Sequence, residues 1–293
     1  MSMMKTIREI KGEAVERLKS CWAESVMISL LELGIYCLTY TVLLMTARVT
    51  GVHTANNVIL IPEKFSLPFV ISAIVILAVH YIATIPLHFG IRWFFWQNST
   101  GKDVMPVSSV FACYSSRETR SKCLSIKLAA DVRKLGWGLL FVVPVCAELF
   151  LADIIWQNSA KGEDVQIGLL AGCIIMTAGA WVFYMICTIK YIPAGYIMAA
   201  NPYAAAGEII ALCKRTSKRK YVYILKMYAG NIRHAPLIIF IFPILVLRPY
   251  MLMTTAVSVR ESLKEIDGEN GAVNTDNTVS ADNAVGSEKD NGR

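Results

Sequence analysis

The chain has 293 residues, of which 55% are hydrophobic and 17% are charged, and its mean hydropathy is +0.49. This composition excludes an ordinary water-soluble protein and predicts one polytopic membrane domain. The formal net charge is +7, but residues 256–293 hold four basic and eight acidic residues, so the rest of the chain carries +11. Basic residues on one side of a membrane orient a protein and attract anionic headgroups, which favours a lipid bilayer over nucleic acid as the partner.

The first apolar segment follows a charged amphipathic stretch of twenty residues. Trp22 marks the expected membrane interface, and residues 25–47 form the first predicted span, with Glu32 inside it. This apolar run is too long for a cleavable signal peptide. Residues 48–66 contain turn residues and little charge, which predicts a short external loop.

The second predicted span covers residues 67–90 and carries His80 and His88. It ends in consecutive aromatic residues, 93–96, which are expected at headgroup depth. The connection that follows, residues 97–134, holds seven basic and three acidic residues, and its second half predicts an amphipathic helix lying on an anionic leaflet. The basic residues assigned to this lipid-binding surface are Arg117, Arg120, Lys122, Lys127, Arg133 and Lys134.

The third predicted span, residues 135–156, contains Pro144 as an expected kink and carries Glu148. After a short external connection comes the most apolar segment, residues 167–189, which holds 23 residues without a charged side chain or a histidine. At about 1.5 Å per residue, a helix of this length crosses the roughly 30 Å hydrocarbon core of a bilayer. Three small residues mark a helix-packing face, used either within the chain or in a homodimer: Gly168, Gly172 and Gly179.

A further helix is expected from residue 203 to the densest basic cluster in the chain, which is also assigned to the lipid-binding surface and consists of Lys214, Arg215, Lys218, Arg219 and Lys220. Because basic residues gather in the N-terminus and in alternate connections, these surfaces and the N-terminus are predicted to be cytoplasmic. The last apolar region is either one bent span, residues 235–257, which would place the C-terminus outside, or a hairpin of two short spans, residues 221–256, which would place it in the cytoplasm. The polar residues 263–293 predict a disordered acidic tail behind a membrane domain of residues 1–262.

Several short motifs follow one another along residues 5–262: Ala14 with Leu18-Lys19 and Trp22; Pro86-Leu87 with Gly90, Arg92, Phe94 and Gly101; Tyr196 with Asn201-Pro202; Cys213-Lys214-Arg215; and Pro249-Tyr250. In this order they resemble a bacterial family of integral membrane proteins known only as a domain of unknown function, the one numbered nine-seven-five. Cys213 stands where that family usually has Ser, and Arg219 where it usually has Gly. The resemblance implies six helices, both termini on the cytoplasmic side of the plasma membrane, and no known activity.

Glu32 is the deepest charged residue of the predicted spans, and burying a charge there costs about 2.5 to 3.5 kcal/mol on insertion scales. One interpretation is a proton- or cation-binding site with His80 or His88, because an imidazole exchanges protons near neutral pH. The other is a carboxyl group that only stabilises helix packing. Glu148 is a second candidate for the intramembrane ionisable site.

Enzyme signatures are missing from the sequence: it has no H-E-x-x-H zinc helix, no G-x-S-x-G elbow and no glycine-rich nucleotide loop. The eight cysteines lack C-x-x-C spacing and lie in apolar spans or basic segments, so we expect reduced thiols, no metal site and no cofactor.

We therefore expect an all-α, polytopic transmembrane helix bundle of five or six spans with interfacial amphipathic helices. Its expected role is that of a non-enzymatic accessory or scaffold protein of the plasma membrane, which binds anionic lipid and a membrane-protein partner or a second copy. The alternative is a small transporter or channel with Glu32 and His80 as a proton- or cation-linked site.

Overall fold

The computed structural model describes residues 6–52, 54–56, 59–62, 66–101, 104–158, 163–216 and 245–266. These residues are helical apart from one small antiparallel hairpin and short connections. The elements are α1 (Ile7–Ser20), α2 (Trp22–Val49), β1 (Thr54–Asn56), β2 (Ile59–Pro62), α3 (Leu67–Thr100), the 3-10 helix η1 (Val107–Tyr114), α4 (Arg117–Asn158), α5 (Glu163–Thr188), the 3-10 helix η2 (Ile189–Tyr191), α6 (Ala194–Ala200) and helices 206–216 and 245–266.

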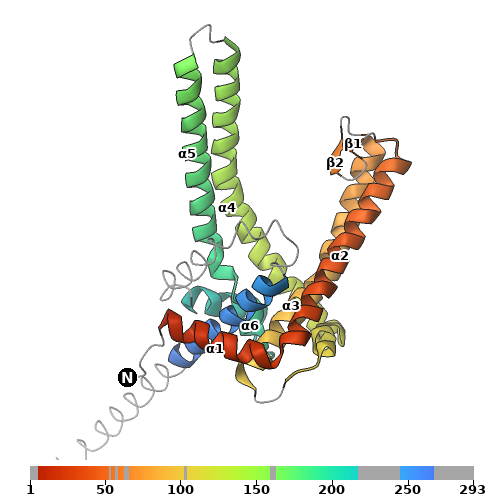
Figure 1. Ribbon diagram of the computed structural model, residues 1–293, viewed down its shortest axis with the longest axis vertical. Coiled ribbons are helices and arrows are strands. Elements are labelled where there is room, and N and C mark those ends of the chain that lie inside the picture. The colour runs from red at the N-terminus through yellow and green to blue at the C-terminus, as the bar shows by residue number, and fades with distance from the viewer. Residues whose placement is uncertain are drawn as a thin grey trace, which may run out of the picture.

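Two pairs of long helices rise from a common base (Figure 1). The base comprises α1, the second half of α3, η1, the start of α4, α6 and helices 206–216 and 245–266, and one continuous hydrophobic core joins them. Beyond the base, α2 and α3 form one arm, which ends in the β1–β2 hairpin, and α4 and α5 form the other (Figure 1).

Within the residues that the structure describes, four helical segments are long and apolar enough to cross a membrane: residues 22–49, 67–100, 117–151 and 170–200. Their arm portions expose large apolar side chains all round, such as Leu38 at 65% and Ile175 at 70%. A continuous apolar surface of this kind is stable in hydrocarbon rather than in water. The described chain is therefore that of a helical, multi-pass membrane protein, which confirms the prediction from composition.

Local sequence signals account for several helix boundaries. Thr6 and Glu9 form a capping box that begins α1, with each side chain bonded to the backbone N–H of the other residue. The Ser66 hydroxyl accepts a hydrogen bond from the Phe69 N–H at the start of α3. Gly51 takes a φ of +70° directly after α2, a conformation that glycine adopts without steric cost.

In one place in the base, the backbones of two elements are in direct contact. A Cβ added to Gly90 of α3 would lie 1.7 Å from the carbonyl oxygen of Val110 in η1. Only glycine allows this approach, and the two elements enclose fully buried rings at Phe94 and Phe95. Tyr196 of α6 is also buried, and its hydroxyl donates to the carbonyl of Leu252, 3.0 Å away, which links α6 to helix 245–266.

Two helices continue beyond the limits that hydropathy predicted. The second span was expected to end at residue 90, but α3 continues to Thr100, and the aromatic residues 93–96 pack into the core of the base. The amphipathic segment 117–134 and the third span form one continuous helix, α4. The expected loop 48–66 contains the β1–β2 hairpin. The predictions for residues 217–244 and 267–293 lie outside the described residues.

Candidate functional site

Glu32 lies where α2, α3 and helix 245–266 meet, at the upper edge of the base. Its side chain is 2% exposed. Its Oε1 atom is 3.1 Å from Nδ1 of His88 on α3 and also forms an ion pair with the guanidinium group of Arg248. Three elements that are far apart in the chain therefore supply one carboxylate, one imidazole and one guanidinium group.

The Glu32 carboxylate retains capacity for hydrogen bonding. Neither of its oxygens accepts a hydrogen bond of good geometry from a described residue, and Nε of Arg248 is also buried without such a partner. Buried polar groups are normally fully hydrogen-bonded, so an exception needs an explanation. The ion pair with Arg248 balances the charge of Glu32 but leaves oxygen lone pairs for a proton, a cation or a water molecule.

Further polar and aromatic side chains extend from this site along the α2–α3 arm. The hydroxyl of Tyr36 is 3.4 Å from Nε2 of His88, and its ring centroid lies 5.4 Å from that of His80. Nδ1 of His80 is in turn 2.7 Å from Oγ1 of Thr39. Residues 32, 36 and 39 share one face of α2 because they are spaced four and three apart. The result is a row of polar and aromatic side chains that extends from Glu32 along the arm.

The structure selects among the expected partners of Glu32. His88 is the imidazole at the carboxylate, whereas His80 contacts Thr39 further along the arm. Glu148 lies on α4 in the other arm and takes no part in this cluster (Figure 1). Sequence reasoning did not select Arg248, which lies within the last apolar region. An isolated arginine between apolar residues was the signal available.

The second candidate site is a cavity of about 480 Å³ between α3, η1 and the start of α4. Arg117, Arg120 and Ser121 contribute its polar groups from α4, and apolar atoms dominate the α3 side. The residues that line this α3–α4 cavity are Ile82, Ala83, Pro86, Tyr114, Arg117, Arg120, Ser121 and Leu124.

Tyr114 joins two walls of the α3–α4 cavity. Its hydroxyl donates to the carbonyl of Ala83, 2.5 Å away, and burial raises the pKa of this hydroxyl above its ordinary value. The group therefore remains a hydrogen-bond donor at neutral pH, and it holds η1 against α3.

Charged residues continue along the same face of α4 toward the arm. Lys127 lies 2.8 Å and Lys134 3.4 Å from the carboxylate of Asp131, and the Tyr81 hydroxyl of α3 donates to that carboxylate at 2.5 Å. Arg117, Arg120, Lys127 and Lys134 follow one another at intervals of three, seven and seven residues, so they share one side of the helix.

The other residues of the predicted lipid-binding surface lie elsewhere. Lys122 donates to the carbonyl of Pro202, away from the α3–α4 cavity, and Arg133 donates to the carbonyl of Ala129 on its own helix. Lys214 and Arg215 are exposed on helix 206–216. Lys218, Arg219 and Lys220 lie outside the described residues. The described residues of the predicted lipid-binding surface therefore lie on different faces of the protein.

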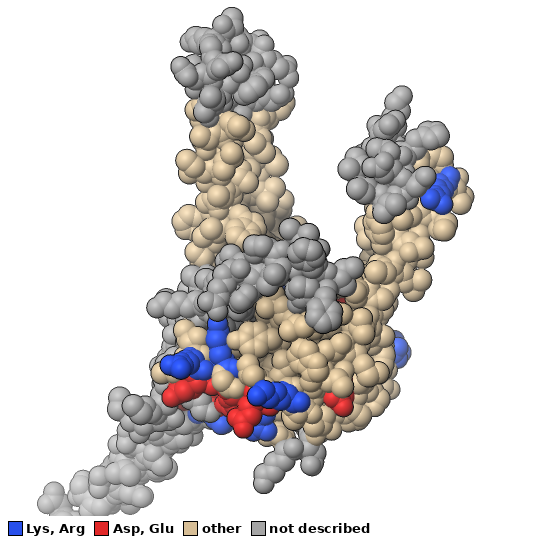
Figure 2. Space-filling model, viewed as in Figure 1, with Lys and Arg blue, Asp and Glu red and all other residues tan. Residues whose placement is uncertain are grey.

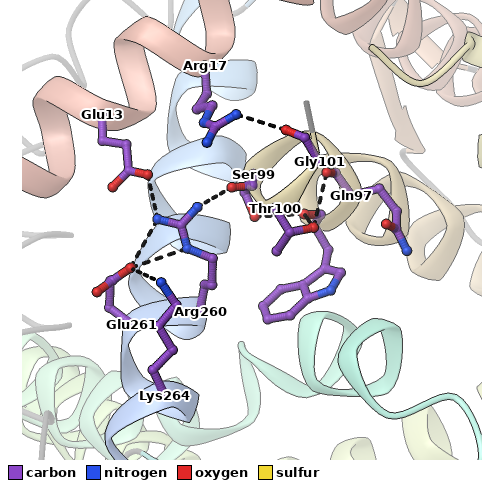
Figure 3. Close-up of polar contacts among 10 residues, drawn as sticks. Glu13, Arg17, Gln97, Ser99, Thr100, Gly101, Arg260, Glu261 and Lys264 are labelled. Atoms are coloured by element: carbon purple, nitrogen blue, oxygen red, sulfur yellow. Dashed lines mark hydrogen bonds and ion pairs between the residues drawn. The ribbon is translucent and has the colours of Figure 1, made fainter. Parts of the chain in front are cut away.

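Charged side chains concentrate on the base, whereas the arms are almost entirely uncharged (Figure 2). Within the base, Arg260 is 8% exposed and joins three elements (Figure 3). It donates to the carbonyl of Ser99 at the end of α3 and forms ion pairs with Glu13 of α1, at 2.5 Å, and with Glu261, at 3.0 Å. These contacts fasten helix 245–266 to α1 and to the end of α3.

The predicted helix-packing glycines have open surroundings. A Cβ at Gly168, Gly172 or Gly179 would meet no described atom within 4 Å. The close approach of another helix to this face is therefore not made by a described part of the chain, and the homodimer alternative stays a prediction.

Comparisons with protein-family models, with curated proteins and with solved structures found no match to this chain. The resemblance to the family of unknown function numbered nine-seven-five therefore stays a prediction.

Proposed function

We propose that this multi-pass membrane protein is non-enzymatic and holds the headgroup of an anionic phospholipid in the α3–α4 cavity. The observation that carries the proposal is the position of Arg117 and Arg120 at an otherwise largely apolar cavity. Residues of α3 change from exposed to buried between Ile82 and Thr84, so the cavity lies where the arm enters the base. A lipid approaching along the arm would meet the two guanidinium groups at this level.

The chemistry of the α3–α4 cavity matches the two parts of a phospholipid. Guanidinium groups bind phosphate through paired N–H donors, and each basic residue near an anionic surface contributes about 1 kcal/mol. The hydroxyl of Ser121 adds a polar group beside them, and Ile82 and Leu124 offer apolar surface to an acyl chain. A volume of about 480 Å³ lies within the usual range for small-ligand sites.

The wider arrangement that goes with this proposal is a bundle of five or six spans in a bacterial plasma membrane. Its base and both termini face the cytoplasm, and the bound lipid and the exposed basic residues Lys214 and Arg215 present a surface to a protein partner. The excess of basic residues in the base supports this orientation, because such residues are retained on the cytoplasmic side.

Native mass spectrometry of the protein in discs of mixed neutral and anionic phospholipid tests the proposal. The double variant Arg117→Gln/Arg120→Gln removes about 2 kcal/mol of attraction, so retention of phosphatidylglycerol should fall roughly 30-fold. The matched control, Lys122→Gln/Arg133→Gln, removes two charges from the same helix outside the cavity and should retain the lipid. Equal retention by the two double variants would sink the proposal.

A second candidate function is a proton- or cation-linked transporter that uses Glu32 and His88, with His80 as the next group along the arm. The buried carboxylate whose oxygens lack a described hydrogen-bond donor supports it. In liposomes loaded with a pH-sensitive dye, Glu32→Gln should abolish flux, whereas Glu148→Gln, on the other arm, should not. Absence of flux from the wild-type protein over a range of cations would remove this candidate.

A further inference from the structure

Two arginines hold helix 245–266 at opposite ends. Near its start, Arg248 forms an ion pair with Oε1 of Glu32 on α2. Near its end, Arg260 forms an ion pair with Glu13 of α1 (Figure 3). The two arginines are twelve residues apart, which is about 18 Å along an α-helix. Separate contacts therefore fix the two ends of this helix, so one end can be released while the other stays in place.

The Glu32 carboxylate is approached from two other elements. From α3, Nδ1 of His88 lies 3.1 Å from Oε1, and from helix 245–266 the guanidinium group of Arg248 contacts the same oxygen atom. From α2 itself, the Tyr36 hydroxyl lies 3.4 Å from Nε2 of His88. The imidazole and the guanidinium group therefore share one carboxylate oxygen.

The charges at this site balance only while the imidazole and the carboxylate hold no extra proton. Arg248 keeps its positive charge throughout the physiological pH range, whereas a carboxylate or an imidazole can take up a proton. One added proton leaves an excess positive charge, whether Glu32 or His88 holds it. An unbalanced charge is costly in a buried site, so proton uptake favours the departure of a cation.

The exposure of the side chains indicates which cation leaves. Glu32 is buried, whereas the side chain of Arg248 is 39% exposed. Nε of Arg248 is itself buried without a hydrogen-bond partner among the described residues, so withdrawal from the site would let it bind water or a headgroup. Arginine has a long side chain that can extend its charged group to water. Arg248 is therefore the group that can leave this site.

We propose that one proton, taken up by Glu32 and His88 together, displaces Arg248 and releases the first turn of helix 245–266. The proton is held either on the carboxylate or on the imidazole, and its loss restores the ion pair. The Tyr196 hydroxyl, bonded to the carbonyl of Leu252, holds the next turn, so the release ends there. This inference rests on the second candidate function only for the exchangeable proton, and it needs no transport across the membrane.

Hydrogen–deuterium exchange of the full-length protein in lipid discs tests the proposal from about pH 8 to about pH 5, with correction for the intrinsic effect of pH on exchange. In an α-helix the amides of residues 250–253 pair with the carbonyls of residues 246–249, so they report on the turn that carries Arg248. In the wild-type protein these amides should exchange about tenfold faster at the lower pH, as expected for the loss of one hydrogen bond to a charged group. The amides of residues 262–264, which report on the turn of Arg260, should keep their protection.

Matched variants separate the ion pair of Arg248 from the rest of the helix. Glu32→Gln removes the negative charge, so residues 250–253 should exchange rapidly at every pH. Glu13→Gln removes an acceptor of Arg260 at the other end and should leave the pH response of residues 250–253 unchanged.

The wild-type pH series needs no variant, so it decides the proposal even where Glu32→Gln fails to fold. Constant protection of residues 250–253 over the whole pH range overturns the proposal, as does a wild-type pH response in Glu32→Gln. A wild-type response in the absence of flux supports this inference and removes only the transporter candidate. Flux without the response overturns this inference and leaves the transporter candidate in place.

Discussion

The base and the arms of this protein are stabilised by different interactions. In the base, buried aromatic rings, the backbone contact between Gly90 and Val110 and the ion pairs of Arg260 fix one arrangement of seven helical segments. In the arms, large apolar side chains face outward, and polar side chains such as Thr41 and Thr46 donate to carbonyls of their own helix. Packing therefore determines the base, whereas the surrounding lipid determines the arms.

The same kind of substitution should therefore have opposite effects on stability in the two regions. A side chain added to the base must displace protein atoms, while one added to an arm meets lipid. Pairs of variants, one in the packed base and one at an exposed or arm position, test this difference through the free energy of unfolding.

Gly90→Ala should destabilise the protein by about 3 kcal/mol or more, because its Cβ would lie 1.7 Å from the Val110 carbonyl oxygen and a backbone atom cannot move aside cheaply. Gly34→Ala is the control on α2, where a Cβ meets nothing within 4 Å, and should stabilise the helix by up to about 1 kcal/mol. Thermal unfolding of both variants in the same lipid measures the contrast. Equal stability of the two variants would contradict it.

Arg260→Ala should cost about 3 kcal/mol, since it leaves the carboxylates of Glu13 and Glu261 and the carbonyl of Ser99 without this cation. Lys264→Ala removes a side chain that is 64% exposed from the same helix and should change stability by less than about 0.5 kcal/mol. Chemical unfolding in detergent separates the two variants. A small effect of Arg260→Ala would mean that the network in Figure 3 contributes little to the base.

Tyr196→Phe should destabilise the base by about 1 to 2 kcal/mol, because the buried carbonyl of Leu252 loses its donor. Thr41→Val is the counterpart on an arm: its hydroxyl donates to the Cys37 carbonyl, which belongs to its own helix, and removing it should have almost no effect. Unfolding midpoints of the two variants test the pair. A larger loss of stability in Thr41→Val than in Tyr196→Phe would contradict this prediction.

Gly172→Ala should stabilise the protein by up to about 1 kcal/mol, because its Cβ meets no described atom within 4 Å. The same variant tests the homodimer alternative, since a close helix interface would not accept the extra methyl group. Unfolding and chemical cross-linking should be measured on one preparation. Loss of a cross-linked dimer would assign the face to a second copy of the chain.

Long apolar segments and caps were predictable from sequence because they depend on residues close together in the chain. The spans at residues 67–90 and 167–189 lie within helices of the structure, because a long apolar run is a property of residues close together in the chain. The extension of α3 to Thr100 was missed, because aromatic residues that suit a membrane interface suit a buried core equally well.

The partners of the candidate sites were not predictable in the same way. Hydropathy and charge place Glu32 in a span, but they do not choose between His80 and His88 or bring Arg248 to the carboxylate. Nor does the separation of 75 residues between Cys123 and Met198 indicate that their sulfur atoms lie 3.8 Å apart. Such contacts join residues distant in the chain and leave no periodic pattern.

Helical spans and a charge excess outside them follow from local composition and from the cost of placing charge in hydrocarbon, so the amino-acid sequence was enough to predict a helical, multi-pass membrane protein. The side chains that meet at the Glu32 site and at the α3–α4 cavity became known only from the fold. They come from segments far apart in the chain, which are brought together because the base packs those segments around one core.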